Sequence, residues 1–167
     1  HVPAAYMASA LYAGLALSSF VYFVWRHAIA DAAAAVIAPI GAVFTALALA
    51  TGSIWGKPMW GTWWEWDARM TSVLVLFLVY LGYIALRSAL EDAQQAARAG
   101  AILAMAGVIN LVIVKFSVEW WSSLHQPASV FRADGPTIDP SQLWPLGLMA
   151  LGYSRLLDTS PTDSHLY

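Results

Sequence analysis

Residues 55–67 read Trp-Gly-Lys-Pro-Met-Trp-Gly-Thr-Trp-Trp-Glu-Trp-Asp, and they stand between two long apolar stretches. Five of the nine tryptophans of the chain fall in this short run. One or two tryptophans at a helix end are typical of a membrane–water interface, but five exceed that need. The run offers flat ring faces, indole N–H donors and two nearby cations, Lys57 and Arg69. It therefore indicates a site for a large, flat, anionic ligand.

The composition is that of a membrane protein. Apolar residues make up 60% of the chain, charged residues only 11%, and the mean hydropathy is +0.63, whereas soluble domains average roughly 25% charged residues. The near-neutral charge gives no basic footprint for nucleic acid. With no cysteine, the chain has no disulfides, thiolate metal sites or iron–sulfur clusters of its own. It begins at His1 rather than methionine, so we expect a fragment of a longer protein.

Five apolar segments predict an all-α, polytopic transmembrane helical bundle, because about 20 residues cross a bilayer as a helix. The fifth is short and marginal as a span. Residues 1–157 are predicted to form a single domain, with a tryptophan-rich segment at 52–69 and a second loop at 115–142, followed by a polar tail at 158–167. The five segments are residues 4–25, 32–51, 70–86, 99–114 and 143–157.

Counting the spans places the polar segments on two sides. If each of the first four segments crosses, then His1, the tryptophan-rich segment and His125 share one side, and His27 lies on the other. The lysine and arginine counts of the two sides are equal, so the positive-inside rule does not orient the chain.

Two histidines on one side suggest a metal or a haem, because imidazole is a common ligand of transition metals and of haem iron. A zinc site needs about four ligands, and the sequence has no H-x-x-x-H or H-E-x-x-H pattern. Haem needs only two axial side chains, aromatic walls, and cations or N–H donors for its propionates. The residues of this chain therefore meet the requirements of a haem site better than those of a zinc site.

Each of these residues also has a plainer interpretation. His125 beside Trp120 and Trp121 suits an interfacial aromatic belt, and the two cations suit anchors at the headgroup level. Asp67 is more often a helix N-cap than a functional acid. Asn110 is a polar residue inside the fourth segment, so by default it is a candidate functional residue. Its plainer interpretation is a hydrogen bond to a neighbouring helix.

The chain resembles a known family at these same positions. It is similar to the haem-handling membrane proteins with a tryptophan-rich "WWD" segment, and within them to cytochrome c maturation protein C, also called haem exporter protein C. The matching stretches are His1-Val2-Pro3-Ala4-Ala5, Ala38 through Phe44, Thr51-Gly52-Ser53, Trp55 through Arg69, Ser117-Val118-Glu119-Trp120-Trp121 and Leu124-His125-Gln126.

This resemblance implies a six-helix protein of the bacterial inner membrane that holds non-covalent, b-type haem on its periplasmic face. His1 and His125 are then the axial ligands of the iron. The implied partners are membrane lipid, the haem chaperone CcmE, the ATP-binding-cassette subunits CcmA and CcmB, and the one-helix subunit CcmD. The other implied haem-site residues are Trp55, Lys57, Trp60, Trp63, Trp64, Trp66, Asp67, Arg69, Trp120 and Trp121.

The chain departs from the family in lacking a helix before His1 and in a short, weakly matched part from about Pro145. We expect a scaffold that binds haem and transfers it for c-type cytochrome biogenesis, rather than an enzyme, because no nucleophile with a base is evident. A haem-lyase-like role stays open. The alternatives are a b-type haem electron-transfer subunit and a structural membrane subunit without haem.

Overall fold

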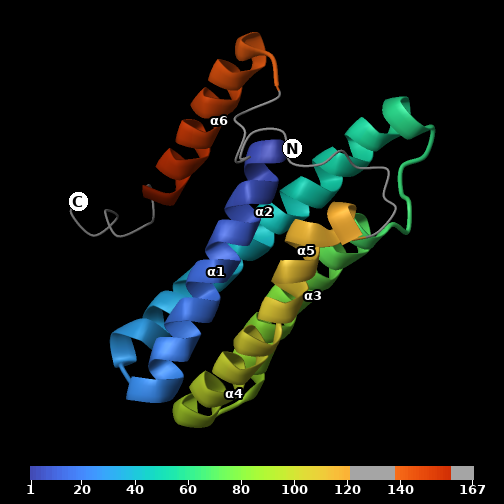
Figure 1. Ribbon diagram of the computed structural model, residues 1–167. Helices are drawn as coiled ribbons and strands as arrows, with labels where there is room; N and C mark the ends of the chain where they lie inside the picture. Colours follow the sequence, from blue (N-terminus) through green and yellow to red (C-terminus); the bar gives the residue numbers. More distant parts are fainter. Residues whose placement is uncertain (121–137, 159–167) are drawn as a thin grey trace.

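The computed structural model describes residues 1–120 and 138–158, with side chains described for 1–116 and 138–155. This part of the chain is all-α and contains no strand, which confirms the predicted fold class. Its helices follow one another in chain order, and the first five are joined by short connections (Figure 1). They are α1 (Val2–Trp25), α2 (Ala28–Trp60), α3 (Ala68–Ala89), α4 (Ala93–Ala106), α5 (Val108–Trp120) and α6 (Pro140–Asp158).

Four helical stretches among the described residues are long and apolar enough to cross a membrane: α1, α2, α3, and the stretch Ala93–Phe116 that joins α4 to α5. They cover the first four predicted segments. The fifth segment forms α6, which is not among the four. Many large apolar side chains of the four stretches, such as Leu17, Val43, Leu78 and Ile109, are exposed in the isolated chain, as expected of helices whose outer faces contact lipid.

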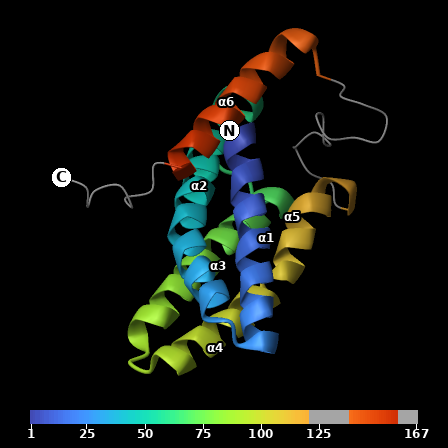
Figure 2. The ribbon, with the colours of Figure 1, turned by 90° about the vertical axis from the view of Figure 1, so that its left-hand side faces the viewer.

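Two turns mark one end of the bundle, away from the N-terminus in both ribbon views (Figures 1 and 2). Arg26 ends α1 in the left-handed conformation, and its N–H donates to the Tyr22 carbonyl at 2.8 Å. The turn between α3 and α4 lies at the same end. Arg87 donates to both carboxylate oxygens of Asp31, with Nη2 to Oδ2 at 3.0 Å, which ties α3 to α2 there.

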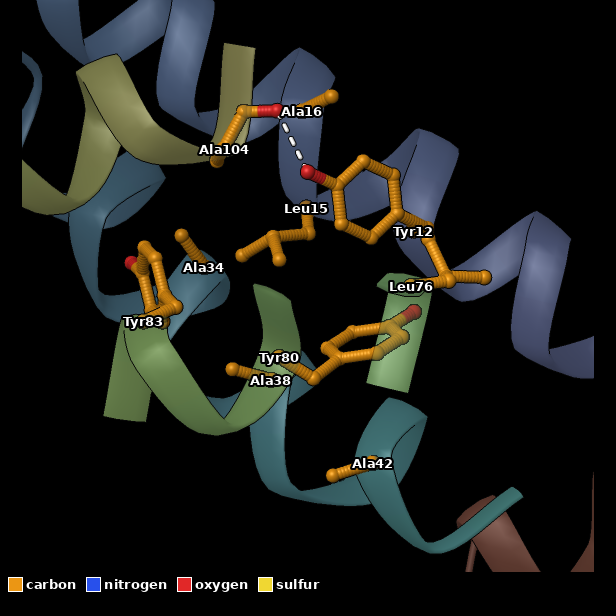
Figure 3. Close-up of a cluster of buried hydrophobic side chains, with 10 residues drawn as sticks. All are labelled: Tyr12, Leu15, Ala16, Ala34, Ala38, Ala42, Leu76, Tyr80, Tyr83 and Ala104. Carbon is orange, nitrogen blue, oxygen red and sulfur yellow. Dashed lines mark hydrogen bonds between the residues drawn. The ribbon is translucent and has the colours of Figure 1, made fainter. Parts of the chain in front are cut away.

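Tyrosines from α1 and α3 fill the centre of the bundle (Figure 3). Tyr12 and Tyr80 meet edge to face with ring centroids 5.2 Å apart. Both hydroxyls are satisfied by backbone carbonyls of neighbouring helices: Tyr12 donates to Ala104 at 2.8 Å, and Tyr80 donates to Ala8 at 2.9 Å. Because a hydroxyl buried between membrane-spanning helices has no water to bond, these pairs fix the helices against one another.

Small residues on the facing helices make room for these rings. A Cβ atom at Gly41 of α2 would overlap the ring of Tyr80, and one at Gly107 would overlap the hydroxyl end of Tyr12. Ala34, Ala38 and Ala42 continue the Gly41 side of α2 toward α3. Helix association in a membrane depends on such close approach, because lipid is as apolar as the helices are.

The fourth span is interrupted at Gly107, where α4 ends and α5 begins almost in line with it (Figure 1). The Tyr12 hydroxyl bonds the Ala104 carbonyl in the last turn before this break, and a side chain inserted into the helical hydrogen-bond ladder is a known cause of such interruptions. Beyond it, Asn110 Nδ2 donates to the Ser72 carbonyl of α3 at 2.9 Å. The plainer interpretation of Asn110, a hydrogen bond to a neighbouring helix, is thereby confirmed.

Candidate functional site

Because the second span was predicted to end at residue 51, the whole tryptophan-rich segment was expected to be a loop. The structure shows instead that its first part is helical. Helix α2 continues through Pro58 to Trp60 and is 33 residues long. At 1.5 Å per residue it measures about 50 Å, against about 30 Å for a hydrocarbon core. Its last turns extend beyond the N-terminus of α1 in Figure 1. The first tryptophans of the segment therefore stand on a rigid helical extension.

Gly61 ends α2 and starts the irregular stretch that leads to α3. Its φ of 79° lies in the left-handed region that glycine adopts without strain. Its N–H donates to the Lys57 carbonyl, and the Lys57 ammonium donates to the Gly61 carbonyl, both at 3.0 Å. Lys57 Nζ also lies 5.9 Å from the ring centroid of Trp63. This cation thus stabilises the C-terminal end of α2 while lying among the tryptophans.

Within residues 55–66 the structure shows two edge-to-face pairs of tryptophans. Trp55 and Trp60, on the helical extension, have ring centroids 5.2 Å apart, and Trp64 and Trp66, in the irregular stretch, have theirs 5.5 Å apart. Trp55, Trp63 and Trp66 are 45%, 57% and 73% exposed, which is far more than a packed core would leave. Large exposed aromatic surface of this kind is typical of a binding surface.

The tryptophans of the segment do not all lie on one helix. Trp60, Trp63 and Trp64 would share a face if the segment were one helix, but the helix ends at Trp60. The chain turns instead at Thr62, whose hydroxyl donates to the Trp64 carbonyl at 2.8 Å and accepts from the Trp64 N–H at 3.3 Å. Trp63 and Trp64 therefore follow a side-chain-stabilised turn, and the rings pair in the way just described.

Asp67 begins α3 as its N-cap, with Oδ1 accepting from the Met70 N–H at 2.7 Å, so the capping interpretation is confirmed. Replacing such a cap by alanine costs about 1 kcal/mol. Arg69 follows in the first turn of α3, where a positive charge opposes the helix dipole. A residue that breaks a local rule in this way is a candidate for a functional role.

His1 lies against α2 rather than projecting into solvent. Its Nδ1 is 2.9 Å from the Ala48 carbonyl oxygen and 3.4 Å from Thr51 Oγ1. The buried residues Ala48, Gly52 and Gly56 lie one turn apart on α2. The His1 ring contacts this row at Gly52, and the Trp60 ring contacts it at Gly56. One row of small residues thus connects His1 with the tryptophans.

Some predicted site residues lie outside the described part of the chain. His125 and Trp121 fall in residues 121–137, and Trp120 is placed only as the last residue of α5. The structure brings His1 and the tryptophan-rich segment to one end of the bundle and places His27 in the α1–α2 turn at the other end (Figure 2). The span count is confirmed for these residues, and the position of His125 stays a prediction.

Ala48, Thr51 and Gly52 contact His1, and the sequence reasoning did not single them out as candidate site residues. Ala48 acts through its carbonyl, which no side-chain pattern reveals. Thr51-Gly52 is a polar and small pair at the predicted end of an apolar run, and it resembles an ordinary helix end. Only the contact with His1, 47 or more residues away in sequence, gives these positions their meaning.

The described residues present groups that fit a haem. His1 has its Nδ1 engaged, which leaves Nε2 for a ligand. Trp64 Nε1 is a buried donor that has no hydrogen-bond partner within residues 1–116 and 138–155, and a propionate would supply an acceptor. Lys57 and Arg69 add positive charge on either side of the irregular stretch. No group of three or more metal-binding side chains gathers among these residues.

Comparison with known proteins gives one consistent result. A sequence model of the family described as Heme exporter protein C matches residues 1–161. Heme exporter protein C of Bradyrhizobium diazoefficiens is 55% identical over 159 residues, which is 95% of this chain and 60% of that protein. Its namesake in Escherichia coli K12 is 50% identical over 159 residues, 95% of this chain and 64% of that protein. The chain therefore spans about 60–64% of the length of these curated relatives.

A mitochondrial protein also matches most of this chain. It is the "Putative cytochrome c biosynthesis ccmC-like mitochondrial protein" of Marchantia polymorpha, which is 45% identical over 149 residues, 89% of this chain and 62% of that protein.

Proposed function

Because this chain belongs to the haem exporter protein C family, we propose that it binds haem at the exoplasmic membrane surface and passes it to a haem chaperone for c-type cytochrome biogenesis. The observation that carries this proposal is the position of His1. Its imidazole is held on α2 by the Ala48 carbonyl, one turn before the tryptophan-bearing extension. A ligating nitrogen and exposed aromatic faces thus share one helix.

The residues divide the work of holding haem. His1 and His125 are the axial ligands, and the haem supplies the iron and the flat macrocycle. The exposed faces of Trp55, Trp63 and Trp66 stack on the macrocycle, each worth about 0.5–1.5 kcal/mol beyond area burial. The other tryptophans of the segment, with Trp120 and Trp121, wall the site. Lys57, Arg69 and the Trp64 N–H bind the propionates, and Asp67 holds the start of α3.

The position of the site favours transfer over electron transport. His1 lies against Ala48 and Thr51, at the end of the second predicted span, whereas a b-type electron-transfer haem is usually held by histidines inside the spans. A haem at such a surface is open to a partner on one face. The proposed recipient is the haem chaperone CcmE, and CcmA, CcmB and CcmD are the proposed membrane partners. In this role the chain is a transfer scaffold with no catalytic residue of its own.

Absorption and transfer measurements test this function. The full-length protein, purified in detergent, is expected to show the spectrum of six-coordinate, low-spin, non-covalently bound haem. Mixing it with haem-free CcmE should move the haem to the chaperone, as followed after separation of the two proteins. A full-length protein that binds no haem would contradict the proposal. A haem that cycles with a quinol but never leaves the protein would favour the electron-transfer alternative.

We further propose that the site faces the periplasm of the bacterial inner membrane. Thr62 lies in the irregular stretch beside the tryptophans, and Ser88 lies at the opposite end of α3. In the cysteine-free chain, Thr62→Cys and Ser88→Cys create single labelling positions. A membrane-impermeant thiol reagent added to intact spheroplasts should label Thr62→Cys and spare Ser88→Cys. The same result is expected when the labelling is repeated on haem-depleted protein. Labelling of Ser88→Cys alone would show that the orientation is opposite to the one proposed.

A further inference from the structure

The hydrogen bonds around His1 determine which ring nitrogen carries the proton. A carbonyl oxygen can only accept, so the Ala48 carbonyl, 2.9 Å from Nδ1, requires a proton on Nδ1. A neutral imidazole has one N–H. Nε2 is therefore left with a lone pair, which is the state that a metal requires.

Thr51 reinforces this choice. Its hydroxyl donates to the Leu47 carbonyl in the preceding turn of α2, at 2.6 Å. Since a hydroxyl has a single proton, the oxygen presents a lone pair to Nδ1 at 3.4 Å. Both polar neighbours of Nδ1 are then acceptors. In the opposite tautomer, the lone pair of Nδ1 would face the lone pairs of the Ala48 carbonyl and the Thr51 hydroxyl.

Gly52 determines how closely the ring approaches α2. A Cβ atom at this position would lie 2.8 Å from Cε1 of His1, closer than side-chain carbons come to other atoms, and 3.1 Å from Nδ1, which is a tight contact. Any other residue at position 52 would push the ring away from the Ala48 carbonyl. The space at Gly52 and the hydrogen bond at Ala48 are therefore parts of one arrangement.

We propose that the Ala48 carbonyl and Gly52 are positioning groups that fix His1 in the tautomer and orientation required for binding haem iron through Nε2. This inference rests on the proposed function of His1 as an axial ligand. Histidine ligands commonly donate their second N–H to a backbone carbonyl, which orients the ring and raises its basicity. Loss of such an outer partner lowers metal affinity by about 10- to 100-fold.

Nitrogen-15 NMR of the haem-free, full-length protein with labelled histidine tests the tautomer directly. His1→Ala identifies the His1 signals by their disappearance. Above the imidazole pKa, we expect a protonated Nδ1 and an unprotonated Nε2 in the wild type. Gly52→Ala should shift these signals toward those of an unconstrained ring. A wild-type His1 protonated on Nε2 would overturn the inference, whatever the haem measurements give.

Haem titration gives the second readout. Gly52→Ala should raise the dissociation constant for haem by about 10- to 100-fold, and added imidazole should restore the low-spin spectrum. Gly14→Ala is the matched control, since its Cβ would lie an ordinary 3.6 Å from Ile37, and it should bind haem like the wild type. An unchanged constant in a folded Gly52→Ala protein would refute the positioning role. Unchanged haem binding in His1→Ala would instead refute the ligand assignment.

Discussion

Full-length protein carrying His1→Ala or His125→Ala is expected to lose its six-coordinate, low-spin haem spectrum. Each change removes one of two imidazoles from the iron, and a direct ligand contributes more than an outer-shell partner does. We therefore expect the dissociation constant for haem to rise by more than the roughly 100-fold upper effect of an outer-shell change. Absorption spectra of the purified variants, recorded at equal protein concentration, measure both the spin state and the haem content.

His27→Ala is the matched control for this experiment. His27 is exposed and N-caps α2 without a side-chain hydrogen bond, at the end of the bundle opposite to His1. It should keep both the spectrum and the haem content of the wild type. If His125→Ala keeps the low-spin spectrum while His27→Ala loses it, the assignment of the two ends of the bundle to ligand and non-ligand histidines is wrong.

Span counting on the sequence predicted which parts of the candidate site lie at the same end of the bundle. Four apolar runs of about 20 residues fix the parity of everything between them, so His1 and the tryptophan-rich segment had to share a side, as the described structure confirms. What parity does not give is contact. The hydrogen bond from His1 to the Ala48 carbonyl depends on how α1 approaches α2, and no local pattern encodes that approach.

The course of α2 through the segment was also beyond the sequence reasoning. Gly52, Gly56 and Pro58 lower helix propensity and are typical of a loop. Each nevertheless has a place in the helix. The first two let the His1 and Trp60 rings lie against the backbone. Pro58 stands in the last turn of α2, where its missing N–H removes a single helical hydrogen bond, the one to the Ile54 carbonyl. Tertiary contacts thus override propensity here.

The core shows a similar division. Hydropathy identified the spans, but it gave no reason to single out Tyr12, Tyr80 or Gly107. Their roles follow from packing between helices distant in sequence, where a tyrosine hydroxyl needs a carbonyl and its ring needs a glycine opposite it. The interruption between α4 and α5 is part of the same packing, and an apolar run that contains two glycines, Gly100 and Gly107, does not show at which of them the helix is interrupted.

This packing makes a second strong prediction. Gly107→Ala should destabilise the bundle by about 1–3 kcal/mol, the usual range for overpacking, because its Cβ would overlap the hydroxyl end of Tyr12 and lie 2.8 Å from Cζ. Tyr12→Phe alone should cost about 0.5–1.5 kcal/mol, since it removes the hydrogen bond to the Ala104 carbonyl. Thermal unfolding of the full-length protein in detergent measures both changes.

The double variant distinguishes this geometry from a general intolerance of substitution. Tyr12→Phe removes the atom that the new Cβ would meet first. The double variant should therefore be destabilised by less than the sum of the two single variants, with a coupling of about 1 kcal/mol in a double-mutant cycle. Gly14→Ala combined with Tyr12→Phe should be additive, because the Gly14 contact is with Ile37. Strict additivity of Gly107→Ala with Tyr12→Phe would show that the Tyr12 hydroxyl does not lie against Gly107, and the explanation of the α4–α5 interruption would then be lost.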